Sequence, residues 1–420
     1  MRTRGLGENS VLALAGDVAS KVGALAVVVL SARLLSVAEF AVLAMGLAAA
    51  GLLGSFLDLG AGTLLTRDGA ASRSDRGALL RGLLRARAPI ALTVIVVSVV
   101  VGALLGQPLT AVAIAVLGVA GALSLSVLGL FRSCQDIRPE AIQRLAAGLL
   151  SIGAVAVIGL AAVPRADAVL GALAVVTLVT LAPLVWLAPR IADFGRSVDP
   201  VKALKLAAPI GLLALATVAY YRSGTLVLAA LDDAHATAMF GIAASVAFGM
   251  LMLPNAITTA LLPRLAAEAD FASLIACSRR ALGWTVVLAV ALAASAAAVV
   301  PIGLPLVLGP EYREAGAPFA ILCLGIPLIA SSGVVGTALL SVGRLRLLGI
   351  QVGVSLAVNL LALALLVPFL GAVGAALATV TCEIVGLAIL VLVARSALPG
   401  LLSLRASPVG GTAQPSSAAA

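Results

Sequence analysis

Twelve apolar runs occupy most of this chain of 420 residues. Each is about 18 to 25 residues long, which at about 1.5 Å rise per residue lets a helix cross a hydrocarbon core of about 30 Å. The sequence therefore predicts an all-α polytopic membrane protein with about twelve transmembrane helices. The runs cover residues 11–32, 39–63, 89–106, 108–131, 142–163, 168–189, 203–230, 236–260, 281–302, 316–341, 347–367 and 372–394.

The balance of residue types excludes a soluble domain. Hydrophobic residues make up 62% of the chain and charged residues 11%, which is more apolar surface than a soluble protein of this length can bury. The four cysteines are isolated, and their spacing matches neither a metal site nor a disulfide framework. We therefore expect neither a bound metal nor a cofactor.

The basic residues are distributed unevenly between alternate loops. If the N-terminus is cytoplasmic, most Lys and Arg residues fall in cytoplasmic loops, and only Arg33, Arg165 and Arg313 fall on the opposite side. This is the positive-inside pattern, so both termini are predicted to be cytoplasmic. The same pattern accounts for the net charge of +9 without a nucleic-acid partner, because the basic loops have no interleaved aromatic residues.

A faint internal repeat divides the chain. Residues 34–67 align with residues 231–264, and the two copies end in Thr-Leu-Leu-Thr-Arg and Ala-Leu-Leu-Pro-Arg. The offset contains an even number of spans, so both copies cross the membrane in the same direction, as in transporters built from two parallel halves. We predict two six-helix lobes with the substrate path between them. The expected domains are residues 1–200, residues 201–400, and a disordered cytoplasmic tail at 401–420 that is rich in Ser, Ala, Gly and Pro.

The first two spans contain charged residues at intramembrane depth. Asp17 and Lys21 are four residues apart and share a helix face, while Asp58 lies in the second span at a similar depth. A charge at the centre of a lone spanning helix costs about 2.5 to 3.5 kcal/mol, so these groups should face protein or a wet cavity. They could form a structural cluster that joins two helices. Alternatively, Lys21 binds an anionic headgroup and one acid carries a proton or sodium ion.

Polar residues in the later spans are further site candidates. Tyr221 and Arg222 in the seventh span could line a cavity that binds phosphate or sugar, although Arg222 could instead extend to the interface. Asn255 follows a proline, where a helix break can expose backbone groups. Asn359 lies in a later span. Glu383 is a lone carboxyl group near mid-membrane, which suits either proton binding or a hydrogen-bonded packing role.

Five segments, in an order and spacing that cover nearly the whole chain, carry a family resemblance: residues 32–62, 208–231, 252–266, 308–328 and 365–386. In these segments the chain resembles the polysaccharide flippases of the multidrug/oligosaccharidyl-lipid/polysaccharide exporter superfamily. The resemblance implies translocation of a polyprenyl-diphosphate-linked oligosaccharide from the inner to the outer leaflet by alternating access, for cell-surface polysaccharide biosynthesis. The implied partners are this lipid-linked oligosaccharide, the bilayer, H⁺ or Na⁺, and a polymerase and glycosyltransferases.

The resemblance also implies roles for the polar residues. Lys21 and Arg222 would contact diphosphate or sugar, and Arg33 would guard the outer end of the path. The substrate-binding candidates are Lys21, Tyr221, Arg222, Arg33, Asn255 and Asn359.

The acidic residues would neutralise these cations or carry the coupling ion. The family often has an Asp after Tyr-Arg in the seventh span, where this sequence has Ser223 and Gly224. The remaining candidates for ion coupling or charge balance are therefore Asp17, Asp58 and Glu383.

Three alternatives remain open. A drug or cation antiporter of the same fold would need fewer cations in its cavity, and a lipid II flippase is usually longer. A membrane glycosyltransferase or polymerase would need a sizeable polar loop, whereas the longest loop, 66–88, is short and basic. No nucleotide-binding motif or nucleophile triad appears, so we do not expect an enzyme. The Ala-rich, Arg-over-Lys composition indicates a high-GC bacterial source, and hence a bacterial plasma membrane.

Overall fold

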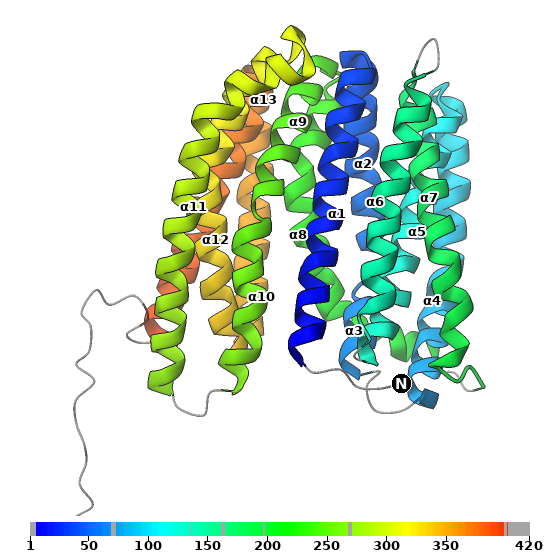
Figure 1. The fold of residues 1–420 in the computed structure, drawn as a ribbon, viewed down its shortest axis with the longest axis vertical. Coiled ribbons are helices and arrows are strands. Elements are labelled where there is room, and N and C mark those ends of the chain that lie inside the picture. The colour runs from blue at the N-terminus through cyan, green and yellow to red at the C-terminus, as the bar shows by residue number, and fades with distance from the viewer. Residues whose placement is uncertain are drawn as a thin grey trace, which may run out of the picture.

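The computed structural model describes residues 6–68, 73–134, 136–160, 164–195, 198–267, 271–398 and 401. In these ranges the chain forms helices and short turns without any strand, as predicted (Figure 1). The α-helices are α1 (Leu6–Leu34), α2 (Val37–Asp58), α3 (Ala61–Asp68), α4 (Arg73–Leu104), α5 (Pro108–Ser133), α6 (Arg138–Ile158), α7 (Ala166–Leu187), α8 (Pro200–Ala230), α9 (Ala234–Met250), α10 (Met252–Ala267), α11 (Phe271–Leu308), α12 (Gly316–Ser341) and α13 (Leu345–Ala397). Two short 3₁₀ helices are η1 (Ala188–Arg190) and η2 (Pro310–Ala315).

The last helix accounts for two of the predicted spans. At 53 residues, α13 would be about 80 Å long if straight, far more than a bilayer needs. Its backbone is non-helical at Gly371 (φ 50°, ψ −127°). A Cβ on Gly386 would lie 2.7 Å from Ser355 Oγ, so the second half of α13 packs back along the first. Gly371 thus separates two antiparallel crossings.

The number of spans agrees with the sequence analysis. In the described ranges, ten helical segments are long and apolar enough to cross a membrane, with α13 counted once. Counting the halves of α13 separately and adding α1 provides a helix for each of the twelve apolar runs. The orientation of the termini stays a prediction, as does the lobe boundary at residue 200. Apart from residue 401, the predicted tail lies outside the described residues.

Two predicted spans are interrupted. The run 39–63 ends as a helix at Asp58, because Leu59 and Gly60 adopt positive φ angles of 40° and 80° before α3 begins. The glycine at 211 in α8 permits a close crossing here, since a Cβ on it would lie 2.1 Å from the carbonyl carbon of Leu59. The run 236–260 is likewise divided at Leu251 into α9 and α10. Both copies of the internal repeat therefore consist of two successive helices.

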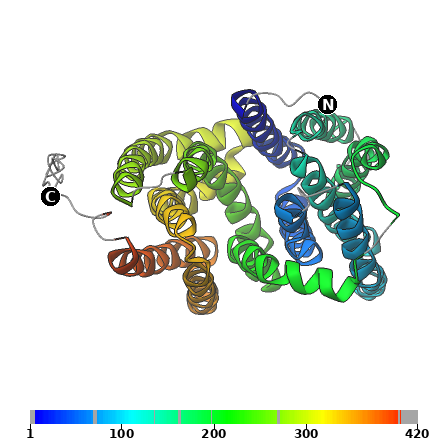
Figure 2. The same cartoon turned by 90° about the horizontal axis from the view of Figure 1, so that it is seen from below.

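Helices α2, α8 and α9 join the two sides of the molecule. The views of Figures 1 and 2 place α4 to α7 on one side and α10 to α13 on the other, with α8 and α9 between them. Helix α8 packs against both α2 and α13, and α9 packs against α2. At the end of the bundle where η2 lies, Phe40 packs edge-to-face on Tyr312, with ring centroids 5.9 Å apart. An apolar cluster around this pair holds the two sides together at that end.

Candidate functional site

A cavity of about 530 Å³ lies where the two sides of the molecule meet. Residues of α1, α2, α5, α6 and α7 line it from one side, and residues of α8 and α9 line it from the other. Its lining combines apolar side chains with cationic and hydroxyl groups. The charged and polar side chains that line it are Ser20, Lys21, Gln143, Arg144, Ser151, Thr177, Tyr221, Arg222, Thr225 and Ser245.

Three of the six predicted substrate-binding residues line this cavity: Lys21 of α1 and the adjacent Tyr221 and Arg222 of α8. Arg222 extends across to α2, because a Cβ on Gly51 would lie 3.5 Å from its Nε. Two cations from distant parts of the sequence therefore share one cavity. An anionic group inside it could accept charge-assisted hydrogen bonds from both.

Helix α6 adds a cation that the sequence analysis did not single out. Arg144 lines the cavity and its Nη2 lies 2.7 Å from the Glu140 carboxylate, which also accepts a 2.7 Å hydrogen bond from Arg132 Nε. Glu140 is buried and fixes both guanidinium groups. The i,i+4 spacing of Glu140 and Arg144 was the available sequence signal. It went unused because α6 starts earlier than its apolar run.

Aromatic rings form part of the cavity wall. The Tyr221 ring lies between Tyr220 and Phe248, with centroid distances of 4.6 Å and 5.1 Å. Tyr221 and Phe248 line the cavity, while Tyr220 is buried behind them. Rings with hydroxyl groups provide flat apolar area together with hydrogen-bonding capacity, which suits contact with sugars.

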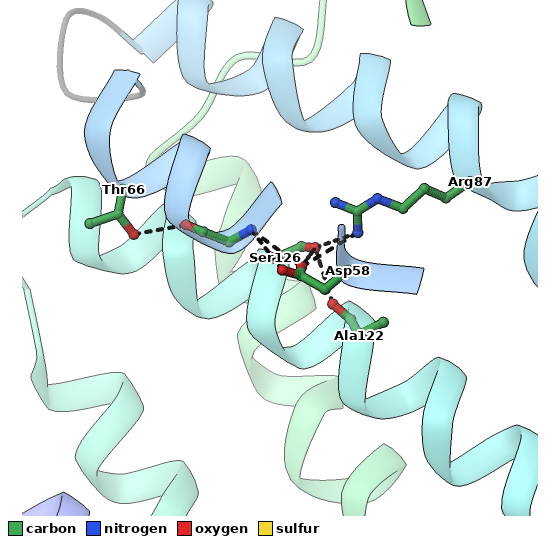
Figure 3. A network of polar contacts seen from close by, with 6 residues as sticks. Asp58, Thr66, Arg87, Ala122 and Ser126 are labelled. Atoms are coloured by element: carbon green, nitrogen blue, oxygen red, sulfur yellow. Dashed lines mark hydrogen bonds and ion pairs between the residues drawn. The ribbon is translucent and has the colours of Figure 1, made fainter. Parts of the chain in front are cut away.

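Asp58 lies outside this cavity, in a separate buried network (Figure 3). Its carboxylate is 3.6 Å from Arg87 Nη1 and accepts hydrogen bonds from the Gly62 amide (3.2 Å) and Ser126 Oγ (3.3 Å). The cation beside Asp58 is thus Arg87 of α4 and not Lys21. The reason is that α1 packs mainly on α6, while the turn after α2 directs Asp58 toward α4 and α5. The side chain of Asp17 lies outside the described residues.

Glu383 and Asn359 belong to a second buried network, between α8 and the two halves of α13. Tyr220 Oη donates to the Glu383 carboxylate (2.5 Å), and Asn359 Nδ2 donates to Ser223 Oγ (2.6 Å). Neither Glu383 nor Asn359 lines the cavity, but the Tyr220 ring contacts the ring of Tyr221 at a tilted angle, and Tyr221 does line it. This network is therefore separated from the cavity by the Tyr221 ring.

The other two predicted residues lie elsewhere. Arg33 is exposed in the last turn of α1. Asn255 is exposed near the start of α10, after Pro254. Neither contributes to the cavity lining.

Comparisons with known proteins agree on the architecture. A family model described as polysaccharide biosynthesis protein matches residues 6–267. The structure of the lipid II flippase MurJ in an inward closed conformation is similar, with a TM-score of 0.66 at 14% identity over 90% of this chain and 86% of that one. The inward-facing conformation of a multidrug resistance MATE family transporter of the MOP superfamily has a TM-score of 0.69 at 15% identity over 93% and 98%.

A third structure has the same fold. The Vibrio cholerae MATE transporter VcmN in the bent form has a TM-score of 0.62 at 15% identity, over 94% of this chain and 97% of that one. A comparison with curated protein sequences found no match. At these identities the structural likeness supports the fold alone.

Proposed function

Because the chain belongs to the polysaccharide biosynthesis protein family, we propose that it flips a polyprenyl-diphosphate-linked oligosaccharide from the inner to the outer leaflet by alternating access. The chain is a multi-pass membrane protein of a superfamily of transporters and flippases. The family prediction made from the sequence is thereby confirmed. The identity of the substrate and the location of the protein in a bacterial plasma membrane are parts of this proposal.

The observation that carries the proposal is the cationic lining of the cavity. Lys21 and Arg222 face it from opposite sides, Arg144 adds a third cation, and no acidic side chain is among its described lining residues. A diphosphate needs such a site, because an unpaired anion in a low-dielectric environment is costly. The planar guanidinium groups could bind phosphate oxygens bidentately, and Tyr221 could pack against the first sugars.

Each side of the molecule contributes cationic residues to the cavity, as alternating access around a shared substrate requires. Lys21 and Arg144 belong to helices on one side of the cavity and Arg222 to a helix on the other. A substrate that binds all three would hold the halves together, and its release would let them separate. Of the coupling candidates, Glu383 is the one that we propose for a proton or sodium ion, since Tyr220 and Tyr221 connect it to the cavity wall. Polymerase and glycosyltransferase partners remain part of this proposal.

A cation-coupled drug antiporter is the second candidate. The observation that favours it is the buried Glu383 carboxyl, whose described side-chain partner is the neutral Tyr220. Three cations in the cavity disfavour it, because they would repel a cationic drug. A lipid II flippase would share the requirement for a diphosphate site, so substrate headgroups must distinguish it.

Purified protein in liposomes tests the proposal. A fluorescent polyprenyl-diphosphate oligosaccharide is followed from one leaflet to the other, beside efflux of a cationic dye and flipping of lipid II. Lys21→Gln and Arg222→Gln are compared with Lys205→Gln, which removes an exposed cation from the same helix as Arg222. The proposal predicts at least about a tenfold slower flipping for each cavity variant, equivalent to about 1.4 kcal/mol, and wild-type rates for the control.

The parallel assays separate the alternatives. Dye efflux driven by an ion gradient without lipid flipping would identify an antiporter. Faster transport of lipid II than of the oligosaccharide would identify a lipid II flippase. Equal flipping rates for wild type and both cavity variants would remove the cationic cavity from the mechanism.

A further inference from the structure

A second hollow, of about 690 Å³, lies between α2, α5, α8 and α13. We call it the apolar groove. Every residue that lines it is Ala, Leu, Ile or Phe. Phe56 and Leu212 on its walls are 45% and 59% exposed, so the groove opens to the outside of the bundle. For helices that cross a membrane, the outside at this position is hydrocarbon.

Helix α8 forms a wall shared by the apolar groove and the cationic cavity. Ala219 and Leu226 line the groove, and Arg222, three residues after the first and four before the second, lines the cavity. Residues at these spacings lie along one helix face. Arg222 therefore stands at the boundary, with a cationic environment on one side and an apolar one on the other.

Helix α2 forms the matching part of the boundary. Leu47 lines the cavity, while Ala49 and Leu52 line the groove. Gly51 lies between Ala49 and Leu52 in the sequence, and the Arg222 guanidinium group lies over it. The charge that would bind a phosphate is thus held at the point where α2 presents no side chain to it.

We propose that the apolar groove holds the proximal part of the lipid tail while Arg222 binds the diphosphate, so that the tail leaves the protein between α2 and α8. This inference rests on the proposed function. In a polyprenyl diphosphate the anionic head is bonded directly to the hydrocarbon chain, and the structure places a cation directly beside an apolar slot. Hydrocarbon in the groove is no more stable than in lipid. The groove therefore allows the head to enter the cavity without pulling the tail through it.

Site-directed photolabelling tests where the tail lies. A polyprenyl diphosphate with a diazirine in its first isoprene unit is bound to the full-length protein, and adducts are mapped by mass spectrometry. The proposal predicts adducts in residues 49–56 and 212–226, reduced at least about tenfold by Arg222→Gln. A diazirine-labelled phosphatidylcholine should show no dependence on Arg222. Labelling by the diphosphate probe that is unaffected by Arg222→Gln would mean that the groove takes bulk lipid only. Adducts confined to α1 and α9 would mean that the tail leaves on the opposite face, and either result overturns the proposal.

A variant that fills the groove provides an independent test. Ala219→Trp should slow flipping of the lipid-linked oligosaccharide at least about tenfold, while a sugar diphosphate without a tail binds with unchanged affinity. Ala214→Trp is the matched control, because Ala214 is exposed on the same helix and does not line the groove. Wild-type flipping by Ala219→Trp, or weakened binding of the tailless ligand, would contradict the proposal. These binding and labelling measurements do not require transport, so they can fail while the flippase assay succeeds, and the reverse.

Discussion

Two carboxylates, one on each side of the cavity, are buried in different ways. Asp58 and Glu383 are each 8% exposed. Asp58 has an ionic partner in Arg87 and accepts further hydrogen bonds from Ser126 and Gly62. Glu383 accepts a hydrogen bond from the neutral Tyr220, and among the described residues no cation lies within ion-pair distance of it.

The difference separates a structural charge from one that can change. Removing either member of a buried ion pair leaves the other charge uncompensated, which is strongly destabilising. Two nitrogens of Arg87, Nε and Nη2, have no hydrogen-bond partner among the described residues, so the guanidinium group depends on Asp58 for its compensation. Among the described residues, no charged side chain relies on Glu383 for its compensation. A carboxyl group with only neutral partners can lose or gain its charge without breaking an ion pair, which suits the coupling role that we propose for it.

The largest expected effect comes from breaking the ionic network. Arg87→Met should lower the free energy of unfolding by about 3 to 5 kcal/mol, because it leaves the Asp58 carboxylate buried without a cation. Thermal or denaturant-induced unfolding of the detergent-solubilised protein measures this loss of stability. Arg81→Met, on the same helix, is the control and should change stability by no more than about 0.5 kcal/mol.

A double variant sharpens the same test. Asp58→Asn with Arg87→Met removes both charges and should recover most of the lost stability. An Arg87→Met protein as stable as wild type would mean that the ion pair contributes nothing, and the contrast with Glu383 would disappear.

A smaller effect on stability but a distinct effect on transport is expected for Glu383→Gln. The amide oxygen can still accept the Tyr220 hydrogen bond, so stability should change by about 1 kcal/mol or less. Flipping should lose its response to an imposed proton or sodium gradient while gradient-independent exchange remains. The assay compares liposomes with and without the gradient, with Glu311→Gln, an exposed acid in η2, as the control. A full gradient response in the Gln variant would exclude Glu383 as the coupling group.

An effect on stability alone is expected for Tyr220→Phe. The ring and its packing on Tyr221 are kept, and only the hydrogen bond to Glu383 is lost, so stability should fall by about 1 kcal/mol. Thermal unfolding beside Tyr221→Phe, whose ring pairs with Tyr220 and Phe248, measures the difference. A loss comparable to that of Arg87→Met would place Tyr220 in a network as rigid as that of Asp58.

Much of the architecture could be predicted from the sequence. Hydrophobicity over the length of a membrane crossing is a local property, so each apolar run has its helix, including the two runs that meet at Gly371. The predicted ends of the helices were less accurate than their number. The runs 39–63 and 236–260 continue past the breaks after Asp58 and at Leu251. The first break depends on the positive φ angles of Leu59 and Gly60 and on close packing with α8, which the apolar pattern does not encode.

The site was predictable only in part. Lys21, Tyr221 and Arg222 could be singled out because charged and hydroxyl groups are rare and costly inside a membrane, and this is visible in the residues themselves. Which of them share a cavity depends on how α1, α6, α8 and α9 pack together. Asp58 was expected near Lys21 from its depth, yet depth along the membrane does not specify direction around a helix.

The sequence by itself determined the fold class, the crossings and the family, because these follow from local hydrophobicity and from motif order. Only the tertiary structure decided the partners. It pairs Arg87 with Asp58 and brings Arg144 to the cavity. It also connects Glu383 to the cavity lining through Tyr220 and Tyr221. Such pairings depend on side-chain directions between helices that lie far apart in the chain, and no local pattern of residues encodes them.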